Sequence, residues 1–201
     1  MNPASYKDKA IAIARSRGVV RARDFDAIGI PRVTLRRLVE ERVLISPSRG
    51  HYQLAGVERS AHHSLAEAIA AAPKGVVALL SALQFHGLTT QTPHMVWLLQ
   101  PASAWVPTNP PVALKIIRAT GDVLTKGVER HRIDGVSVPV TNPAKTVADC
   151  FKHRSKVGLD VALESLRNVL RTRKASADDL WHFAGIDRVR QVMRPYLEAT
   201  A

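Results

Sequence analysis

The amino-acid sequence predicts an α+β protein built from two domains of different architecture. Helical periodicity and one short hairpin pattern fill the first 55 residues. Short β-branched runs separated by Pro, Gly and Asn follow between residues 95 and 140, and helical periodicity returns after Asn142. With 201 residues, of which 46% are apolar, the chain is long enough for two small domains and apolar enough to bury a core.

Three helices are predicted at the N-terminus. Apolar residues recur at helical spacing from Tyr6, and Gly18 ends this first helix. A short second helix ends at Gly29, and Pro31 occupies the first turn of a third helix. Between residues 33 and 43 one apolar stripe contains Leu35, Leu38, Val39 and the stem of Arg42, and the opposite face carries Val33, Arg36, Arg37 and Glu40.

A small β-hairpin is predicted after the third helix. Val43–Ser46 and His51–Leu54 have strand composition, and the turn residues Pro-Ser-Arg-Gly lie between them at positions 47–50. Three helices followed by a hairpin is the element order of a winged helix-turn-helix, which places the second helix of its helix pair in the major groove of DNA. The alternative is a three-helix domain with a solvated basic face.

A linker helix and a small antiparallel sheet are predicted next. Ala61–Ala72 is alanine-rich and ends before Pro73, and a further amphipathic helix starts at Val76 and runs into His86. The predicted strands are Met95–Leu99, Val112–Arg118, Val128–Ile133 and Val136–Val140. The predicted domains are therefore a winged helix-turn-helix at 1–57, a linker helix at 58–75 and a C-terminal α+β domain at 76–201.

The C-terminal part of the chain is predicted to be helical. Thr141 or Asn142 caps a helix with Pro143 in its first turn, and Val147 and Phe151 lie on its buried side together with Ala148. The next helix has an apolar stripe of Leu159, Leu163, Leu166 and Leu170, opposite Glu164, Arg167, Arg171 and Lys174. Two more helices, Ala177–Ala184 and Arg188–Ala199, end the chain.

The charge balance points to a polyanionic partner. The chain contains 29 Lys and Arg against 17 Asp and Glu, and the first 60 residues hold 12 of these cations against 6 acids. Clustered cations release counterions from nucleic acid, although solubility alone also favours a basic surface. The apolar runs are too short to span a membrane and no signal peptide is seen, so a cytoplasmic protein with no membrane partner is expected.

Six residues are the candidates for DNA binding. Arginine reads guanine with two parallel hydrogen bonds and also pairs with phosphate, while an exposed valine can contact a thymine methyl group. An arginine at a hairpin tip can enter a minor groove or bind a phosphate. The candidates are Arg32, Val33, Thr34, Arg36 and Arg37 at the third helix, and Arg49 at the tip of the wing.

The sequence predicts neither a catalytic site nor a metal or cofactor site. The eight histidines are dispersed, and the adjacent pair His62 and His63 points to different sides of a helix. The single cysteine, Cys150, can form no intramolecular disulfide and reads as a small core residue. A glycine-rich phosphate loop and the paired acids of metal-dependent nucleases are missing.

Several later motifs resemble the AbiEi antitoxin family. They are the runs Ala78–Thr89, Val96–Leu98, Asn142–Arg154 and Val157–Glu164, and the N-terminal part resembles the winged-helix domain of that family. The resemblance implies the antitoxin of a type IV toxin–antitoxin pair. Such a protein represses its own operon at promoter DNA and opposes a nucleotidyltransferase toxin through its C-terminal domain, without needing a stable complex with that toxin.

The resemblance leaves the partner surface and the assembly state open. Lys145 and Thr146, in the Ala144–Asp149 signature, are candidate partner-binding residues, although a helix N-terminus packed on the sheet explains this stretch equally well. Arg167 and Arg171 are further candidates. The alternative is that they lie on a solvent-exposed helix face that binds no partner. A homodimer on an inverted repeat and two monomers on adjacent half-sites are both compatible with such a module. The competing functions are a winged-helix transcription factor that senses a ligand or partner, and a DNA-targeted nuclease or nucleotidyl-modifying enzyme.

Overall fold

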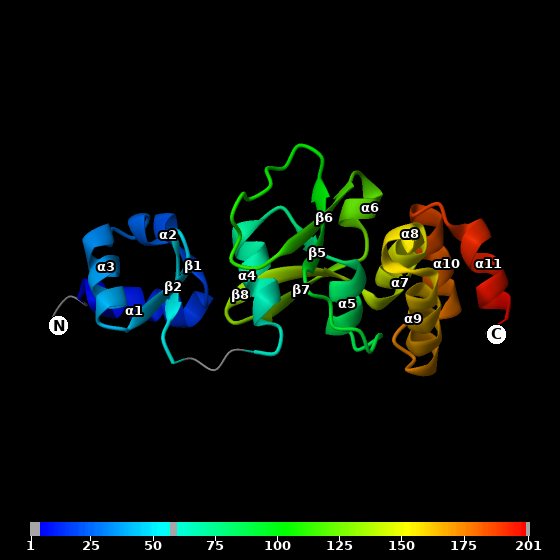
Figure 1. The fold of residues 1–201 in the computed structure, drawn as a ribbon, viewed down its shortest axis with the longest axis horizontal. Coiled ribbons are helices and arrows are strands. Elements are labelled where there is room, and N and C mark those ends of the chain that lie inside the picture. The colour runs from blue at the N-terminus through cyan, green and yellow to red at the C-terminus, as the bar shows by residue number, and fades with distance from the viewer. Residues whose placement is uncertain (1–4, 57–59, 200–201) are drawn as a thin grey trace. The chain divides into compact units, whose positions relative to one another are not determined.

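The structure is a computed structural model that describes residues 5–56 and 60–199. It is a mixed α+β structure whose chain forms two compact units (Figure 1). The first unit contains Met1–Pro73, Val106–Val112 and Arg132–Val138, and the second contains Lys74–Trp105, Ala113–His131 and Pro139–Ala201. Among the described residues no helix is long and apolar enough to cross a membrane.

The first unit begins with three helices and a three-stranded antiparallel sheet. Its elements are α1 (Tyr6–Arg17), β1 (Val20–Arg21), α2 (Ala22–Asp26), α3 (Arg32–Glu40), β2 (Leu44–Ser48) and β3 (His51–Leu54). The sheet order is β1-β3-β2, with Val20 opposite Tyr52 and Leu44 opposite Leu54. The same unit contains α4 (His63–Ala71), which lies within the helix predicted over residues 61–72.

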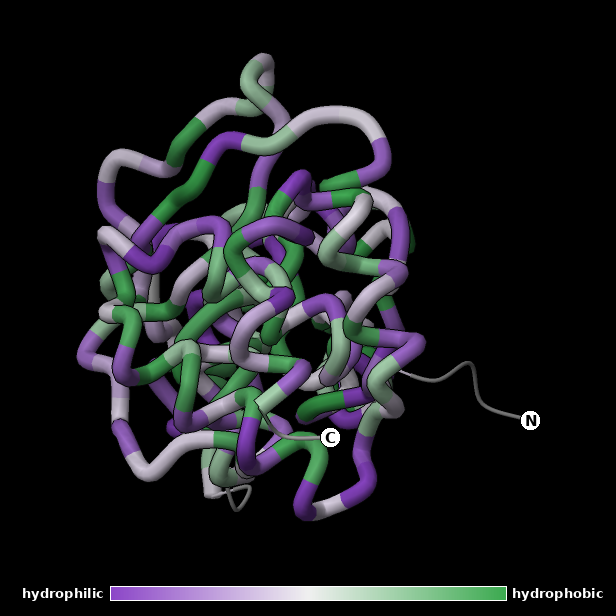
Figure 2. Tube along the Cα trace, turned by 90° about the vertical axis from the view of Figure 1, so that its right-hand side faces the viewer, coloured by the Kyte–Doolittle hydropathy of each residue, from purple (hydrophilic) through white to green (hydrophobic). Residues whose placement is uncertain are grey.

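Local sequence explains where these helices begin and what they bury. Ser5 caps α1 by accepting a hydrogen bond from the backbone N–H of Asp8, whose side chain returns the contact to Ser5. Phe25, Leu35 and Leu38 are fully buried in one cluster that also contains Ala10, Ala14, Val20, Ile30 and Leu44. Apolar stretches alternate with hydrophilic ones along the chain (Figure 2), as expected when each element buries one side.

The hairpin differs in two details from its prediction. Strand β2 extends to Ser48, so that Pro47 lies in the strand and only Arg49 and Gly50 form the turn. This is tolerated because β2 is an edge strand and its register is irregular between Ile45 and Ser48.

The stem of Arg42 does not extend the apolar stripe predicted for the third helix, since α3 ends at Glu40 and Arg42 is exposed in the following turn.

The second unit contains most of a five-stranded mixed sheet. Its strands are β4 (Val76–Val77), β5 (Val96–Pro101), β6 (Leu114–Ala119), β7 (Val128–Ile133) and β8 (Val136–Thr141), in the order β6-β5-β4-β8-β7. The prediction of an antiparallel sheet is wrong, because β5 pairs with β6 and β4 pairs with β8 in parallel, whereas β4 and β5 are antiparallel. The 12-residue connection between β5 and β6 returns the chain to the same end of the sheet.

Strand β4 lies where the start of a helix was predicted. Val76 and Val77 pair with Leu99 and Leu98, and Val77 also pairs with Val140 of β8. The helix predicted from Val76 therefore starts only at Leu79, as α5 (Leu79–Phe85).

The helices of the second unit pack around one apolar cluster. Besides α5 they are α6 (Asp122–Thr125), α7 (Pro143–Lys152), α8 (Arg154–Val157), α9 (Leu159–Arg171), α10 (Ala177–Ile186) and α11 (Arg190–Glu198). Helix α7 contacts α5, α9 and α10, and Figure 1 shows it beside these helices. Its residues Val147, Cys150 and Phe151 are fully buried in the cluster.

The leucine stripe predicted for α9 is only partly the buried one. The buried residues of α9 are Val161, Ala162, Ser165, Leu166 and Val169. Leu163 and Leu170 are partly buried against the cluster, whereas Leu159 is 39% exposed. The buried face is centred on the small and β-branched residues because α9 packs closely against α7.

Candidate nucleic-acid interface

Helix α3 has a buried face and an exposed basic face. Leu35 and Leu38 are fully buried, and Thr34 is only 8% exposed, so its side chain lies on the inner side of the helix. Val33 is 73% exposed. The side chains of Arg32, Arg36 and Arg37 are 73%, 83% and 63% exposed. An exposed aliphatic residue among three exposed guanidinium groups is a surface suited to base edges and phosphates.

Each of these three arginines forms an ion pair with a carboxylate. Arg32 contacts Asp26 of α2 through Nη2 at 2.9 Å and through Nε at 3.4 Å. Arg36 Nε lies 3.1 Å from Glu40, and Arg37 Nε lies 3.5 Å from Glu41. The hydrogen bond from Arg32 lowers the pKa of the Asp26 carboxyl group.

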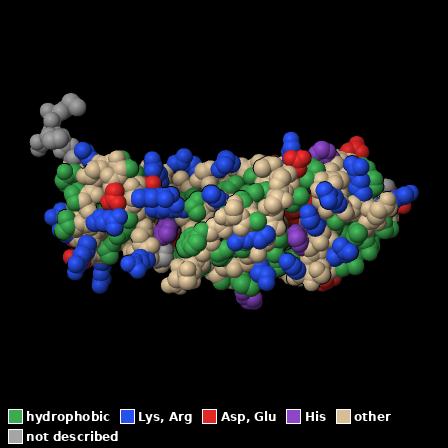
Figure 3. Space-filling model, turned by 90° about the horizontal axis from the view of Figure 1, so that it is seen from above, with side chains coloured by type: hydrophobic (Ala, Val, Ile, Leu, Met, Phe, Trp, Pro, Cys, Tyr) green, Lys and Arg blue, Asp and Glu red, His purple; other side chains and the backbone are tan. Residues whose placement is uncertain are grey.

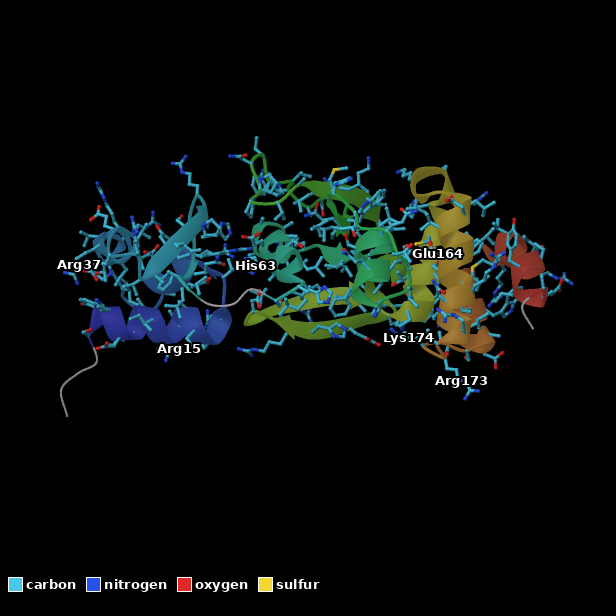
Figure 4. The ribbon with its side chains drawn as sticks, turned by 60° about the horizontal axis from the view of Figure 1, so that its bottom comes forward. Arg15, Arg37, His63, Glu164, Arg173 and Lys174 are labelled. Atoms are coloured by element: carbon cyan, nitrogen blue, oxygen red, sulfur yellow. The ribbon has the colours of Figure 1, made fainter. Side chains whose placement is uncertain are left out.

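Glu41 also connects α3 to α1. Its carboxylate accepts a hydrogen bond from Lys7 Nζ at 2.8 Å, and this contact lowers the pKa of Glu41. Arg37, labelled in Figure 4, therefore shares the Glu41 carboxylate with Lys7 of α1.

Arg49 lies at the tip of the hairpin, as predicted. It is exposed, and Gly50 beside it has a φ of 78°, a left-handed conformation that glycine adopts without steric cost. Ser48 and His51 pair across this two-residue turn. The hairpin therefore presents one arginine at its end.

Lys145 and Thr146 lie inside the second unit and have no exposed surface to offer a partner. Asn142 caps α7 by accepting a hydrogen bond from the Lys145 backbone N–H at 2.8 Å. Thr146 Oγ1 donates within the protein, with the carbonyl oxygens of Asn142 and Thr141 at 2.7 and 3.0 Å. Lys145 Nζ contacts Asp149 and lies 3.1 Å from Asp187. The stretch is thus a helix N-terminus packed in the core.

Arg167 and Arg171 of α9 are exposed, and Arg171 donates a hydrogen bond to the Asn168 side chain at 3.2 Å. The two neighbours in the predicted stripe are not free in solvent. Glu164 accepts hydrogen bonds from Thr89 and Thr90, and Lys174 Nζ donates to the His86 carbonyl oxygen (Figure 4). Only the two arginines remain candidates for a partner surface.

Other cations occur in both compact units, and Figure 3 shows Lys and Arg side chains dispersed over the surface in view. Over the described residues, no group of three or more His, Cys, Asp or Glu side chains is placed to hold a metal ion. The second unit has an open groove of about 320 Å³ between α10 and α11, lined by Ala177, Asp178, Trp181, Arg194, Leu197 and Glu198.

The acidic partners of these cations were not predicted from the sequence. Glu40 and Glu41 follow Arg36 and Arg37 by four residues, a spacing at which side chains on a helix meet, so this pattern was available to find them. Asp187, by contrast, is 42 residues from Lys145 and carries no local signal of its role.

Comparison with known proteins supports a regulator at the N-terminus. Residues 8–55 match the model of a family described as "Transcriptional regulator, AbiEi antitoxin", and the C-terminal motifs that suggested this family lie outside the match. No curated protein matches the chain. The fold resembles the crystal structure of the RV2827C protein from Mycobacterium tuberculosis, with a TM-score of 0.60 and 14% identity over 90% of this chain and 72% of that one. At this identity the likeness concerns the fold alone. The match to the AbiEi antitoxin family of transcriptional regulators is thus confined to residues 8–55, the part of the chain that resembled the winged-helix domain of that family.

Proposed function

We propose that this chain is a DNA-binding transcriptional regulator whose N-terminal region is a winged helix-turn-helix. In this proposal α2 and α3 are the helix pair, the β2–β3 hairpin is the wing, residues 58–75 are a linker, and residues 76–201 form the effector domain. The family match over residues 8–55 carries the proposal. The element order α1-β1-α2-α3-β2-β3, with β1 paired to β3, also supports it.

In this function α3 lies in the major groove of promoter DNA. Recognition helices read base edges with residues near their N-terminus and use neighbouring cations for phosphates. Arg32, Val33, Arg36 and Arg37 are the residues of α3 that take these roles, and Arg49 contacts the backbone or minor groove from the wing. Thr34 contributes through packing, because its side chain faces the core.

The regulator is further proposed to repress its own operon as the antitoxin of a type IV pair. The family description supports an antitoxin, and the toxin implied by the resemblance is a nucleotidyltransferase. Arg167 and Arg171 are the exposed candidates for the C-terminal effector surface. Two copies bind the operator, either as a homodimer or as monomers on adjacent half-sites, and the protein acts in the cytoplasm without catalysing a reaction.

DNA binding is tested with the purified protein and the duplex upstream of its gene, at several salt concentrations, against a scrambled duplex of equal length. We expect salt-sensitive preference for the upstream duplex. The double variant Arg36→Ala/Arg37→Ala should bind it roughly 10- to 100-fold more weakly, because two arginine contacts are lost. Its salt dependence should also become shallower.

The control is Arg167→Ala/Arg171→Ala, which also removes two exposed arginines from one helix, here α9 of the second unit. It should leave the DNA affinity within about twofold, a change that corresponds to less than about 0.5 kcal/mol. Equal losses of DNA affinity in both double variants would mean that binding depends on net charge and not on α3. Unchanged binding in the Arg36→Ala/Arg37→Ala protein would remove α3 from the interface.

The groove beside Trp181 favours a second candidate function, in which the C-terminal region senses a small ligand. Its volume of about 320 Å³ lies at the lower end of the range of small-molecule sites. Co-expression with a neighbouring nucleotidyltransferase separates the two functions. Restored growth that depends on residues 76–201 supports the antitoxin, whereas toxicity unchanged by co-expression favours the sensor.

A further inference from the structure

The helix pair proposed to face DNA carries no net charge. Residues 22–41 contain four Lys and Arg and four Asp and Glu, although the whole chain has a formal charge of +12. Non-specific DNA binding depends on cations near phosphates. Four acids within residues 22–41 would weaken an interface that bound only phosphates. Their presence therefore suggests another role for them.

Two of the acids lie where they can orient arginines. Glu40 and Glu41 contact Arg36 and Arg37 one helical turn earlier, and both ion pairs use the guanidinium Nε. A guanidinium group has five N–H donors in a rigid plane, so an ion pair at Nε leaves the two Nη groups outside that contact. Those Nη groups form the end of the fork that can donate two hydrogen bonds to O6 and N7 of guanine.

Arg32 is held differently. Asp26 engages both Nε and Nη2 of Arg32, at 3.4 and 2.9 Å, so this ion pair occupies a whole edge of the guanidinium. The three arginines are therefore not equivalent. Arg36 and Arg37 are held by one nitrogen each, and Arg32 is held by two.

We infer that Glu40 and Glu41 are positioning residues that hold Arg36 and Arg37 as guanine readers and so set the sequence specificity of the interface. This inference rests on the proposed DNA-binding function. A guanine contact at the Nη end preserves the carboxylate contact at Nε. A phosphate contact carries no information about base sequence. It also brings a second anion close to the carboxylate, and this repulsion disfavours the non-specific complex.

Glu40→Gln is the variant that tests this inference, because Glu40 contacts only α3 in the ion pair and its side chain is 63% exposed. Glu41 is less suitable, since it also binds Lys7 of α1. The matched control is Glu198→Gln in α11. There Arg194 Nε lies 2.7 Å from Glu198 at the same four-residue spacing, and the two side chains are 61% and 64% exposed. Both variants change the net charge by the same amount.

The measurement is the ratio of affinities for the upstream duplex and the scrambled duplex. We expect Glu40→Gln to raise scrambled-duplex binding and to lower this ratio about three- to tenfold, within the range of one arginine–base contact. Glu198→Gln should leave the ratio unchanged. Helix content, followed by circular dichroism, should be the same in both variants.

A second measurement replaces guanines of the upstream duplex by 7-deazaguanine, which lacks the N7 acceptor. The unmodified protein should lose about threefold or more in affinity. The loss should be smaller in both Arg36→Ala and Glu40→Gln, because neither variant retains an oriented Arg36. A merely structural role of Glu40 would not change the sensitivity to N7.

The outcomes separate the two proposals. If the unmodified protein prefers its upstream duplex but Glu40→Gln matches Glu198→Gln in both measurements, the inference about Glu40 is wrong and the DNA-binding function stands. If the unmodified protein shows no preference for the upstream duplex, the proposed function fails and the inference fails with it.

Discussion

Lys145 is a charged side chain with no exposed surface, and its burial depends on two carboxylates. It contacts Asp149 one turn further along α7 and Asp187 at the end of α10, both of which are also buried. Lys152 reaches Asp187 from the surface at 3.6 Å. A buried ion cluster is costly to desolvate, so the loss of one partner leaves uncompensated charge in the core.

Replacing Lys145 by Met should therefore lower the free energy of unfolding by about 3 to 5 kcal/mol, as measured by urea denaturation. The apolar stem is retained, and the two acids lose their shared cation. Lys152→Met on the same helix is the control. Its side chain is 32% exposed and its ion pair is long, so the change should be at most about 1 kcal/mol. Similar effects in the two variants would contradict the role of the buried cluster.

Asp149 is expected to make stability depend on pH. Burial raises the pKa of this carboxyl group from 3.8 to about 7, and the neighbouring Asp187 adds to the shift while Lys145 opposes it. The folded state then binds a proton more tightly than the unfolded state does. The contribution of Asp149 to stability is fully present below the unfolded-state pKa and is lost as pH rises through about 7.

Urea denaturation at a series of pH values between 4 and 7 checks this expectation. The variant Asp149→Asn removes the titrating group while keeping its size. The unmodified protein should lose stability with rising pH relative to this variant, with a slope of at most about 1.4 kcal/mol per pH unit for one proton. Parallel curves for the two proteins would show that Asp149 remains ionised throughout this pH range.

At the scale of elements, α9 holds the segment that follows α5. The Glu164 carboxylate accepts hydrogen bonds from the Thr90 backbone N–H at 3.1 Å and from the Thr89 hydroxyl at 3.3 Å. Asn168, one turn later, donates to the Leu88 carbonyl oxygen at 3.1 Å. The polar face of α9 is thus a support for the chain between α5 and β5.

Glu164→Ala should loosen this segment without unfolding the protein. We expect faster amide hydrogen exchange at Thr90 and a loss of about 1 to 2 kcal/mol in the free energy of unfolding, because a carboxylate contact to two residues is removed. Arg167→Ala on the same helix is the control for lost helix-surface contacts. Unaltered exchange at Thr90 in the Glu164 variant would contradict the supporting role of α9.

Sequence patterns predicted the elements whose signals are local. Helix α3, the hairpin and α7 follow from Pro31, from the turn at Gly50 and from the Asn142 cap. Strand β4 was predicted as part of a helix because it has only two residues. They form a strand through backbone pairing with β5 and β8, which lie far away in the sequence. Parallel pairing in the sheet was missed for the same reason, since strand order is set by contacts between distant segments.

The candidate site was predictable only in part. The outward arginines of α3 follow from helical periodicity. Lys145 was a partner candidate because it lies in the signature that resembles the AbiEi family, and the structure shows the alternative given for that stretch, a packed helix N-terminus. The burial of Lys145 is explained by its ion pair with Asp187. That residue is too distant in the sequence for local patterns to predict the contact.

For the whole molecule, net charge does not mark the region that we propose to bind DNA. The first compact unit holds 13 Lys and Arg against 8 Asp and Glu, and the second holds 16 against 9. The excess of cations over the first 60 residues is therefore diluted once the rest of that unit is included. The arrangement of individual cations and acids on α3 is the better indicator of function, because specificity depends on short-range geometry and not on total charge.

The burial of Cys150 provides a natural reporter of protein opening. This single cysteine is fully buried in α7, and burial raises the pKa of its thiol well above the usual value. A thiol-reactive reagent can therefore modify it only in molecules in which α7 has separated from its neighbours. The rate of labelling reports how often this core opens, on the unaltered chain and with DNA either present or absent.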